Sequence, residues 1–382
     1  MRAALPVCDR SGDRDPSAGG ETRERSVRSG CSPALHDRAT EVVATGSAPP
    51  GNPREATPMN ATPFSTRRVT PKTASDRHPS QADVTQRAST GHERALVLHG
   101  GGSAGNAWEI GVIAGLAEAG LDVTDADLII GTSAGATAAA QITSATPAEL
   151  LAAILSTTPP QLTPAGSGGG RAPKGAVPDH LERTGRIIAA AEDAADMRRG
   201  MGAAALALDA ASDGSWPTRW RTTVAARLPS QRWPERAILI TAVDARTGEP
   251  VVFDRHSGVD LVDAVAASTS SGPPFRIGDD LYIDGGYRRN ENADLAAGYA
   301  RVLVLSPFGG RSRHPLEWGM QLAAQVEELR AAGSSVETVV PDGNSVAAFG
   351  DDMMNLSTRP PAARAGYDQG SVLAGQLAEF WR

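Results

Sequence analysis

The hydrophobic pattern divides the chain at about residue 91. In residues 1–91 no apolar periodicity extends beyond a few positions, and Arg, Ser, Pro, Thr, Gly and Asp predominate. Such a composition buries too little apolar surface to offset the entropy that is lost on ordering. We therefore expect residues 1–91 to form a disordered tail and residues 92–382 to form one large folded domain.

Beyond the tail, short apolar runs alternate with apolar residues at helical spacing. Strands are predicted at residues 94–99, 128–130, 236–243, 250–253, 279–284, 301–305 and 336–340. Helices are predicted after the first two strands and at residues 147–156, 181–208, 259–267 and 292–300, with C-terminal helices within 316–382, at 317–331 and 361–382. This alternation predicts a three-layer α/β/α fold with a mostly parallel central sheet.

The strand at 128–130 leads directly into Gly131-Thr132-Ser133-Ala134-Gly135, a Gly-x-Ser-x-Gly pattern. In a nucleophile elbow, these two glycines permit a turn so tight that the serine hydroxyl stands clear of the backbone. The helix that follows would direct its N-terminal amides and the positive end of its dipole toward Ser133. Taken alone, the pattern also fits an ordinary turn between a strand and a helix.

A second glycine-rich turn, Gly100-Gly101-Gly102-Ser103-Ala104-Gly105, follows the strand at 94–99. Because neighbouring parallel strands end at the same edge of a sheet, its amides are expected beside Ser133, where they would form an oxyanion hole.

The glycine-rich turn allows two other interpretations. The spacing Gly100-x-Gly102-x-x-Gly105 also fits a dinucleotide-binding turn, but the next strand ends in the serine elbow rather than in an acidic residue. An α/β-hydrolase would use Ser133, Asp284 and His314 in that chain order. The roughly thirty residues between the glycines and Ser133 fit only one βαβ crossover, which argues against it.

The strand at 279–284 ends in Asp284-Gly285-Gly286. We expect Asp284 at the same sheet edge as Ser133, although Asp-Gly alone is also typical of a hairpin turn. Asp244, which follows the strand at 236–243, is a rival for the active-site acid, but its Asp-Ala-Arg-Thr-Gly context is typical of a turn.

The glycine turn, the serine elbow and the Asp-Gly-Gly motif occur in this order within residues 94–307, and together they resemble the signatures of the patatin-like phospholipases. That resemblance implies a Ser-Asp dyad with Ser133 as nucleophile and Asp284 as general base, without a histidine. Many family members carry a basic residue in the glycine turn where this chain has Ala104, and this departure leaves the substrate preference open. The resemblance implies oxyanion-hole residues at Gly100, Gly101, Gly102, Ser103 and Gly105.

The function implied is that of a serine-dependent lipid acyl hydrolase of the phospholipase, lysophospholipase or carboxylesterase type, acting through an acyl-enzyme intermediate. It needs no metal and no cofactor. Acyl transfer through the same site and a non-catalytic lipid-binding role are the alternatives.

Charge and cysteine content narrow the class of protein further. The net charge is −7 and no basic stripe is present, which argues against nucleic acid as a partner. The two cysteines, Cys8 and Cys31, both lie in the tail, so the folded part has neither a disulfide nor a thiolate metal site. No apolar run approaches the length of a membrane span. We expect a cytoplasmic protein, with peripheral membrane contact as a further hypothesis.

Several segments allow two interpretations. Residues 159–178 are rich in Pro and Gly and predict a flexible loop, and the segment 159–215 could be either a helical lid or an ordinary insertion. The tryptophans and arginines of residues 216–233 could contact a membrane interface or simply be packed. Arg288 and Arg289 could meet a head group, but a solvated surface is the simpler expectation, as it is for His314.

Overall fold

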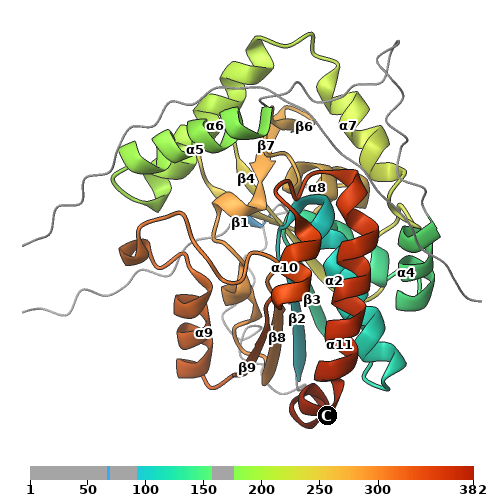
Figure 1. Ribbon diagram of the computed structural model, residues 1–382. Coiled ribbons are helices and arrows are strands. Elements are labelled where there is room, and N and C mark those ends of the chain that lie inside the picture. Colours follow the sequence, from blue (N-terminus) through green and yellow to red (C-terminus); the bar gives the residue numbers. More distant parts are fainter. Residues whose placement is uncertain (1–66, 69–92, 157–175) are drawn as a thin grey trace, which may run out of the picture. The chain divides into compact units, whose positions relative to one another are not determined.

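The structure is a computed structural model that describes residues 67–68, 93–156 and 176–382 (Figure 1). The predicted tail at 1–91 lies outside the described residues except for Arg67 and Arg68. Most of the predicted loop at 159–178 also lies outside them, and its last residues are helical because α5 begins at Ala176.

The central sheet is mostly parallel, as predicted. Its parallel core has the order β4-β3-β2-β8-β9, and every adjacent pair in that order runs in the same direction. These strands are β2 (Arg94–Leu98), β3 (Leu128–Gly131), β4 (Ala237–Asp244), β8 (Arg301–Leu305) and β9 (Ser335–Val339). The buried aliphatic residues of these strands agree with the continuous apolar runs expected of strands that are covered on both faces.

Four further strands extend this core beyond β4. β5 (Pro250–Phe253) pairs antiparallel with β4, and β1 (Arg67–Arg68) pairs parallel with β5. β6 (Phe275–Ile277) and β7 (Asp280–Asp284) form a hairpin, and β7 also pairs antiparallel with β4. The hairpin strands therefore oppose the direction of the parallel core.

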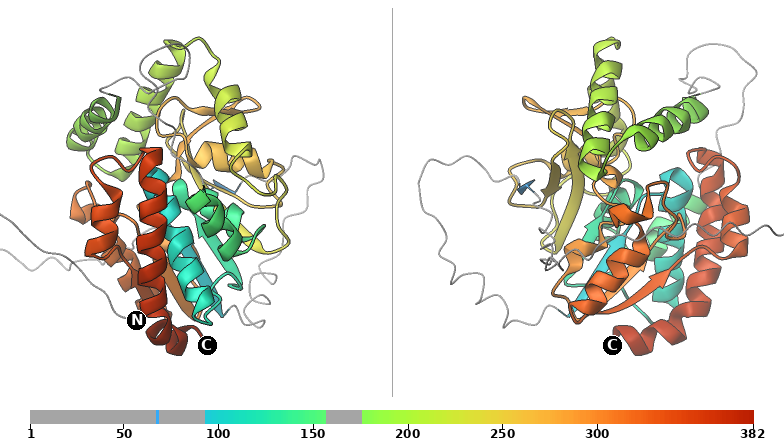
Figure 2. Two further views of the ribbon diagram at one scale, coloured as in Figure 1. Left: turned by 45° about the vertical axis from the view of Figure 1, so that its right-hand side comes forward. Right: turned by 90° about the vertical axis from the view of Figure 1, so that its left-hand side faces the viewer.

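Helices cover both faces of the sheet, which confirms the predicted layers (Figures 1 and 2). Leu96 and Leu98 face one apolar core, with α2, α3, α4, α8 and α11, whereas Ala95 and Val97 face a second core with α9 and the short 3-10 helix η3. The helices are α2 (Gly102–Glu118), α3 (Ala134–Ile142), α4 (Pro147–Ser156), α5 (Ala176–Ala190), α6 (Ala194–Ala210), α7 (Trp216–Ala225), α8 (Leu261–Ser268), α9 (Leu322–Ala331), α10 (Gly343–Phe349), α11 (Arg359–Trp381) and η3 (Ala293–Ala296).

The terminal helix α11 packs on α2 through small residues. A Cβ atom added to Gly111 would lie 2.1 Å from the Ala363 carbonyl oxygen, and one added to Gly370 would lie 2.2 Å from the Val112 oxygen. The two helix backbones therefore touch, which only glycine permits at these positions. This contact encloses α2, and the side chain of Trp108 on that helix is fully buried.

Two predicted helices are shorter than the sequence suggested. Residues 292–300 hold only the 3-10 turn η3, which begins after Asn292 in a left-handed conformation with φ 58°. The helix predicted at 317–331 begins only at Leu322, because Gly319 adopts a left-handed φ of 63° after the 3-10 turn η4 (Leu316–Trp318). Left-handed residues interrupt the right-handed helix in both cases.

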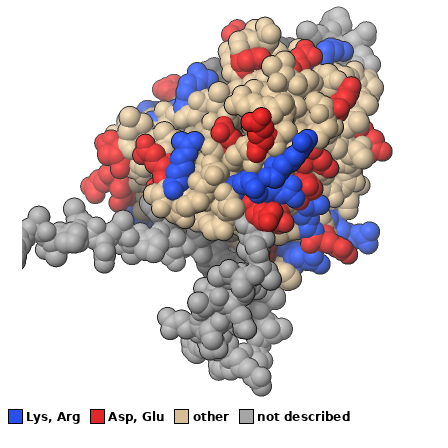
Figure 3. Space-filling model, turned by 90° about the horizontal axis from the view of Figure 1, so that it is seen from below, with Lys and Arg blue, Asp and Glu red and all other residues tan. Residues whose placement is uncertain are grey.

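Charged side chains are mixed on the face of the molecule shown in Figure 3. Basic and acidic residues lie next to one another there, without a large area of one sign. On this face, the distribution offers no extended basic track of the kind that binds a nucleic-acid backbone.

Candidate active site

The serine pattern forms a sharp turn between β3 and α3. Ser133 has φ 55° and ψ −117°, a conformation that is uncommon for a residue with a side chain. A Cβ atom on Gly135 would lie 2.1 Å from the Leu98 carbonyl oxygen, and one on Gly131 would lie 2.6 Å from Cα of Ala136. Both glycines are therefore required by sterics, which explains the spacing of the motif.

The strand that carries Asp284 reaches the serine from the opposite direction to the one expected. The sequence suggested that Asp284 ends a strand at the carboxyl edge of the sheet, but β7 runs antiparallel to β4. Gly131 pairs with Ile240 and Asp284 pairs with Ala242 on the same edge of β4. β3 and β7 thus point at each other along β4, and their ends meet at the turn that holds Ser133.

This head-on arrangement brings the two predicted dyad side chains together. The Ser133 hydroxyl donates to Oδ2 of Asp284 at 2.7 Å, and the Gly286 amide donates to Oδ1 at 2.8 Å. The Ser133 amide donates to the Ser268 hydroxyl at 2.9 Å, which fixes the elbow against α8. The carboxylate is therefore held in one orientation by two donors.

Burial changes the acidity of this carboxyl. Asp284 is 8% exposed, and its desolvation raises the pKa to about 6, although the hydrogen bonds from Gly286 and Ser133 lower it. The pKa is raised because a low-dielectric surrounding disfavours the charged form. At neutral pH the carboxylate is ionised and is a stronger base than an exposed aspartate.

The glycine-rich turn lies beside the serine, at the start of α2. A Cβ atom on Gly100 would lie 3.1 Å from Cβ of Ser133. The Ala104 amide donates to the Met353 carbonyl and the Gly105 amide donates to the Gly101 carbonyl, both at 2.9 Å. In contrast, no hydrogen bond within the described part of the chain uses the backbone amides of Gly101, Gly102 and Ser103. A helix N-terminus with unused amides is suited to an anion.

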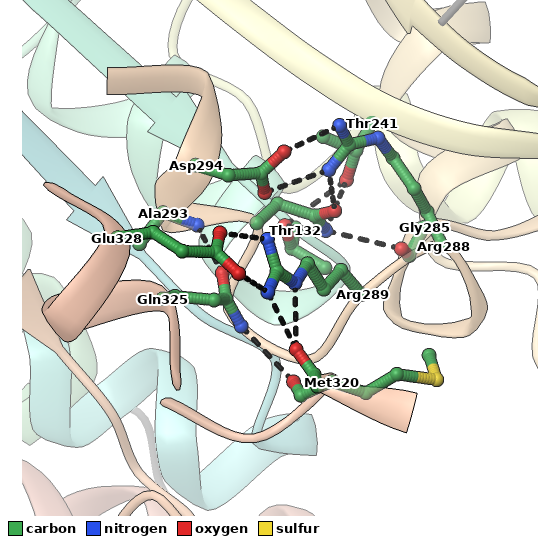
Figure 4. A network of polar contacts seen from close by, with 12 residues as sticks. Thr132, Thr241, Gly285, Arg288, Arg289, Ala293, Asp294, Met320, Gln325 and Glu328 are labelled. Atoms are coloured by element: carbon green, nitrogen blue, oxygen red, sulfur yellow. Dashed lines mark hydrogen bonds and ion pairs between the residues drawn. The ribbon is translucent and has the colours of Figure 1, made fainter. Parts of the chain in front are cut away.

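A buried asparagine, Asn292, connects the two halves of the site, although no sequence motif marks it. The side-chain amide of Asn292 donates to the Thr132 hydroxyl at 2.9 Å, to the Thr241 hydroxyl at 3.2 Å and to the Gly285 carbonyl at 3.1 Å. Thr132 precedes Ser133, and Gly285 follows Asp284. Figure 4 shows Thr132, Thr241 and Gly285 within this network.

The two arginines after the dyad motif are buried, so the expected solvated surface is wrong. Arg288 forms an ion pair with Asp294 at 2.7 Å and donates to Oδ1 of Asn292 at 2.7 Å. Arg289 pairs with Glu328 at 2.6 Å (Figure 4). Glu328 lies 39 residues beyond Arg289, whereas Asp294 follows Arg288 by only six residues, at a spacing that belongs to no regular element. The Arg288 guanidinium thus supports Asn292, and that of Arg289 joins the Gly319 carbonyl to Glu328.

A cation does approach the glycine turn, but from a distant part of the chain. Nη1 of Arg359, at the start of α11, donates to the Ser103 carbonyl at 3.2 Å and to Oδ1 of Asn106 at 3.0 Å. Asn106 in turn donates to the Ala134 carbonyl at 3.4 Å. Burial, and then the like charge of Arg227, lower the Arg359 pKa to about 10, so the group stays charged at neutral pH.

The rival acid and the histidines occupy other places. Oδ1 of Asp244 accepts from the amides of Arg246 and Thr247, both at 2.9 Å, which is the turn suggested by its sequence context. His314 is half-buried rather than exposed, beside Ser312 and Trp318, and burial, followed by Arg313, lowers its pKa to about 4. None of these side chains contacts Ser133 among the described hydrogen bonds.

The tryptophans of residues 216–233 take part in packing. Trp216 stacks on Trp220 with ring centroids 5.0 Å apart, and the Trp220 indole donates to the Ala266 carbonyl at 3.2 Å. The Trp233 indole donates to the Val259 carbonyl at 2.7 Å. Membrane contact of this segment, like a lid at 159–215, stays a prediction.

A family model described as Patatin-like phospholipase matches residues 96–297. The match covers more than half of the chain, and the protein belongs to this family. Membership implies lipid acyl hydrolase activity and a lipid substrate.

Across the described residues, no three His, Cys, Asp or Glu side chains gather in a way that could hold a metal ion. In the same part of the chain, no helix is both long and apolar enough to cross a bilayer.

Two solved structures are similar to this chain at low sequence identity. VipD from Legionella pneumophila is 14% identical, with a TM-score of 0.35, over 75% of this chain and 67% of that one. The type III effector protein ExoU is 15% identical, with a TM-score of 0.29, over 74% of this chain and 54% of that one. The chain thus spans about half the length of ExoU. No curated protein matches the chain.

Proposed function

We propose that the protein hydrolyses an acyl ester of a lipid, with Ser133 as nucleophile and Asp284 as general base. In this reaction Asp284 accepts the Ser133 proton as Oγ attacks the ester carbonyl carbon. The proton then passes from Asp284 to the departing alcohol, which leaves the acyl group on Ser133. Asp284 next takes a proton from a water as that water attacks the acyl carbon, and it returns the proton to Ser133 Oγ when the carbon–oxygen bond to the serine breaks, which releases the free acid and restores the dyad.

The unused amides at the start of α2 suit the charge that develops in this reaction. In the tetrahedral intermediate the former carbonyl oxygen becomes an oxyanion, which the amides of Gly101, Gly102 and Ser103 would bind. Donors that are already oriented stabilise such a charge without reorganisation, and the loss of one typically costs about 10²-fold to 10³-fold in rate.

The single observation that best supports the proposal is the 2.7 Å hydrogen bond from Ser133 Oγ to a carboxylate whose burial raises its pKa to about 6. A general base must lie within hydrogen-bond reach of the proton that it removes and have a pKa near the operating pH. Asp284 meets both requirements.

The proposal is tested with matched substitutions in the full chain. Ser133→Ala and Asp284→Asn should each lower the hydrolysis of p-nitrophenyl octanoate by at least about 10³-fold, and labelling by a fluorophosphonate should be abolished by Ser133→Ala and strongly slowed by Asp284→Asn. The controls are Ser144→Ala, in which a helix-end hydroxyl is removed, and Asp244→Asn, in which the rival acid is replaced.

Both controls should keep wild-type rates, and circular dichroism should show that all four variants are folded. Full activity in a folded Asp284→Asn protein would reject the dyad. Loss of activity in Asp244→Asn instead would transfer the role of the base to that residue.

A further inference from the structure

A partly apolar hollow lies next to the dyad, between α5, α6 and the end of β7. α5 and α6 lie near β7 in Figure 1. On the side of the dyad the hollow is lined by Ser271, Ile283 and Tyr287, and on the helical side by residues that include Arg183 and Met201. Ile283 immediately precedes Asp284 on β7, and Tyr287 of the same lining lies within electrostatic reach of the Asp284 carboxylate.

Arg183 lines this hollow, and Arg313 lies behind it in contact with Thr184, another of its lining residues. Arg313 donates to the Thr184 hydroxyl at 2.9 Å and to the Leu181 carbonyl at 2.7 Å, and Arg183 contacts Nδ1 of His180 at 3.2 Å. All of these partners are uncharged acceptors. Among the ion pairs of the described residues, neither Arg183 nor Arg313 takes part in one.

The two nearby histidines, His180 and His314, add no charge of their own to this region. Burial lowers the pKa of His180, and the charges of Arg183 and Arg313 lower it further. Burial, and then Arg313, lower the pKa of His314 to about 4. Both imidazoles are therefore neutral at neutral pH, and the local charge comes from two guanidinium groups that repel each other.

Tyr287 connects this charged region to the dyad. Its hydroxyl lies 3.5 Å from the Ser271 carbonyl, one residue beyond Ser270, whose carbonyl accepts from the Asp284 amide. Burial and then Asp284 raise the pKa of Tyr287, whereas Arg183 and Arg313 lower it. The phenol thus stands within electrostatic reach of both the general base and the two arginines.

We infer that Arg183 and Arg313 bind the phosphate of the substrate's head group while the ester lies at Ser133. The inference rests on the proposed function and adds a specificity site to it. A phosphate between the two arginines would replace their repulsion by charge-assisted hydrogen bonds, for which the planar guanidinium is well suited. The apolar side chains of Ile187 and Met201 line the same hollow.

Binding to the Ser133→Ala protein tests this inference without requiring turnover. The two ligands are 1-octanoyl-glycerol-3-phosphate and 1-octanoylglycerol, which differ only in the phosphate, and isothermal titration gives both dissociation constants. We expect the phosphate ester to bind at least about tenfold more tightly. In an Arg183→Gln background this preference should largely disappear, and Arg183→Lys should keep part of it.

The matched control is Arg186→Gln on the same helix, whose side chain is 74% exposed and pairs with Glu182 at 3.8 Å. It should keep the full preference, which would exclude a general effect of the charge of α5. Arg313→Gln should act as Arg183→Gln does. Titration with inorganic phosphate separates a free anion from a head group, since we expect it to bind far more weakly than the phosphate ester.

The inference is overturned by equal affinity for the two octanoyl ligands, by a preference that survives Arg183→Gln, or by inorganic phosphate binding as tightly as the ester. Hydrolysis of p-nitrophenyl octanoate by the wild-type chain is measured alongside. Failure of the inference with that activity intact leaves the dyad in place. A preference that depends on Arg183, in a chain that hydrolyses no ester, would instead reject the proposed function alone.

Discussion

The side-chain amide of Asn292 donates to the Thr132 hydroxyl over 2.9 Å, although 160 positions separate the two residues. The same amide reaches the Gly285 carbonyl at 3.1 Å, so one buried group holds the residues next to Ser133 and Asp284. We predict that Asn292→Gly lowers kcat about tenfold with little change in KM, because misplaced reacting groups lose orientation. Steady-state kinetics on p-nitrophenyl octanoate gives both constants.

Glycine is the preferred replacement because Asn292 has a φ of 58°, which glycine adopts without strain. The control is Asn290→Ala in the same loop, where the side chain bonds to the Arg311 carbonyl and not to the elbow. A merely structural role would lower the unfolding free energy in both variants and leave kcat of the folded protein unchanged. That outcome would remove Asn292 from the positioning of the dyad.

The acid limb of the pH profile should report Asp284. Because burial raises the pKa of this carboxyl to about 6, it becomes protonated and inactive as a base when the pH falls through that value. We expect kcat/KM to fall with a midpoint near pH 6 and to reach a plateau above about pH 7. Initial rates in a constant-ionic-strength buffer series between pH 4.5 and 8.5 measure it.

Glu291 could confuse that measurement, because burial raises its pKa to about 7 although Ser306 donates to it at 2.9 Å. Glu291→Gln removes this titration and should leave the midpoint near pH 6 in place. If the limb vanishes in Glu291→Gln, or lies near the pKa of an exposed aspartate, the assignment to Asp284 is wrong.

The same carboxyl should cost stability at high pH. A folded-state pKa of about 6, against 3.8 for the model group, means that the folded protein holds this proton more tightly than the unfolded chain. The resulting stabilisation is complete below about pH 4 and is lost as the pH rises to about 6, a difference of about 3 kcal/mol. Asp284→Asn should therefore raise the unfolding free energy at pH 8 by up to about 3 kcal/mol.

Urea unfolding of the wild type and Asp284→Asn at pH 8, 6 and 4.5 measures this difference, which should shrink as the pH falls. An asparagine can still accept from the Gly286 amide and donate to Ser133, so the site remains satisfied. A variant that is less stable than the wild type at pH 8, or a gain that does not depend on pH, would contradict the prediction.

The sequence was most informative where the backbone itself dictates residue type. Gly131 and Gly135 touch neighbouring backbone at distances that exclude a side chain, so the elbow is visible as a pattern. The Asp-Gly-Gly motif likewise marks Asp284, whose carboxylate accepts from the Gly286 amide two residues on. Local geometry of this kind leaves a local signature, and the parallel core follows from the alternation of strands and helices.

The parts of the site that could not be predicted from the sequence depend on contacts between residues that no local pattern connects. Arg289 looks like a surface residue until Glu328, 39 positions away, is placed beside it. Asn292 has no spacing that predicts contact with Thr132. The direction of β7 did have a signal, because Ile277 pairs with Asp280 across the two residues Gly278 and Asp279, a typical tight hairpin.

Arg359 places a positive charge at the glycine turn, through Ser103 and Asn106, where Ala104 provides none. We predict that Arg359→Met lowers kcat/KM for p-nitrophenyl octanoate about tenfold, because the turn loses both an anchor and a favourable potential for the oxyanion. Arg359→Lys should recover much of this loss if charge is decisive. Arg364→Met, an exposed site on the same helix, is the control and should retain full activity. The ester is neutral, so Arg359 cannot act by attracting a charged substrate, and a loss would concern the reaction itself. An unchanged kcat/KM in folded Arg359→Met would show that the guanidinium only joins α11 to α2.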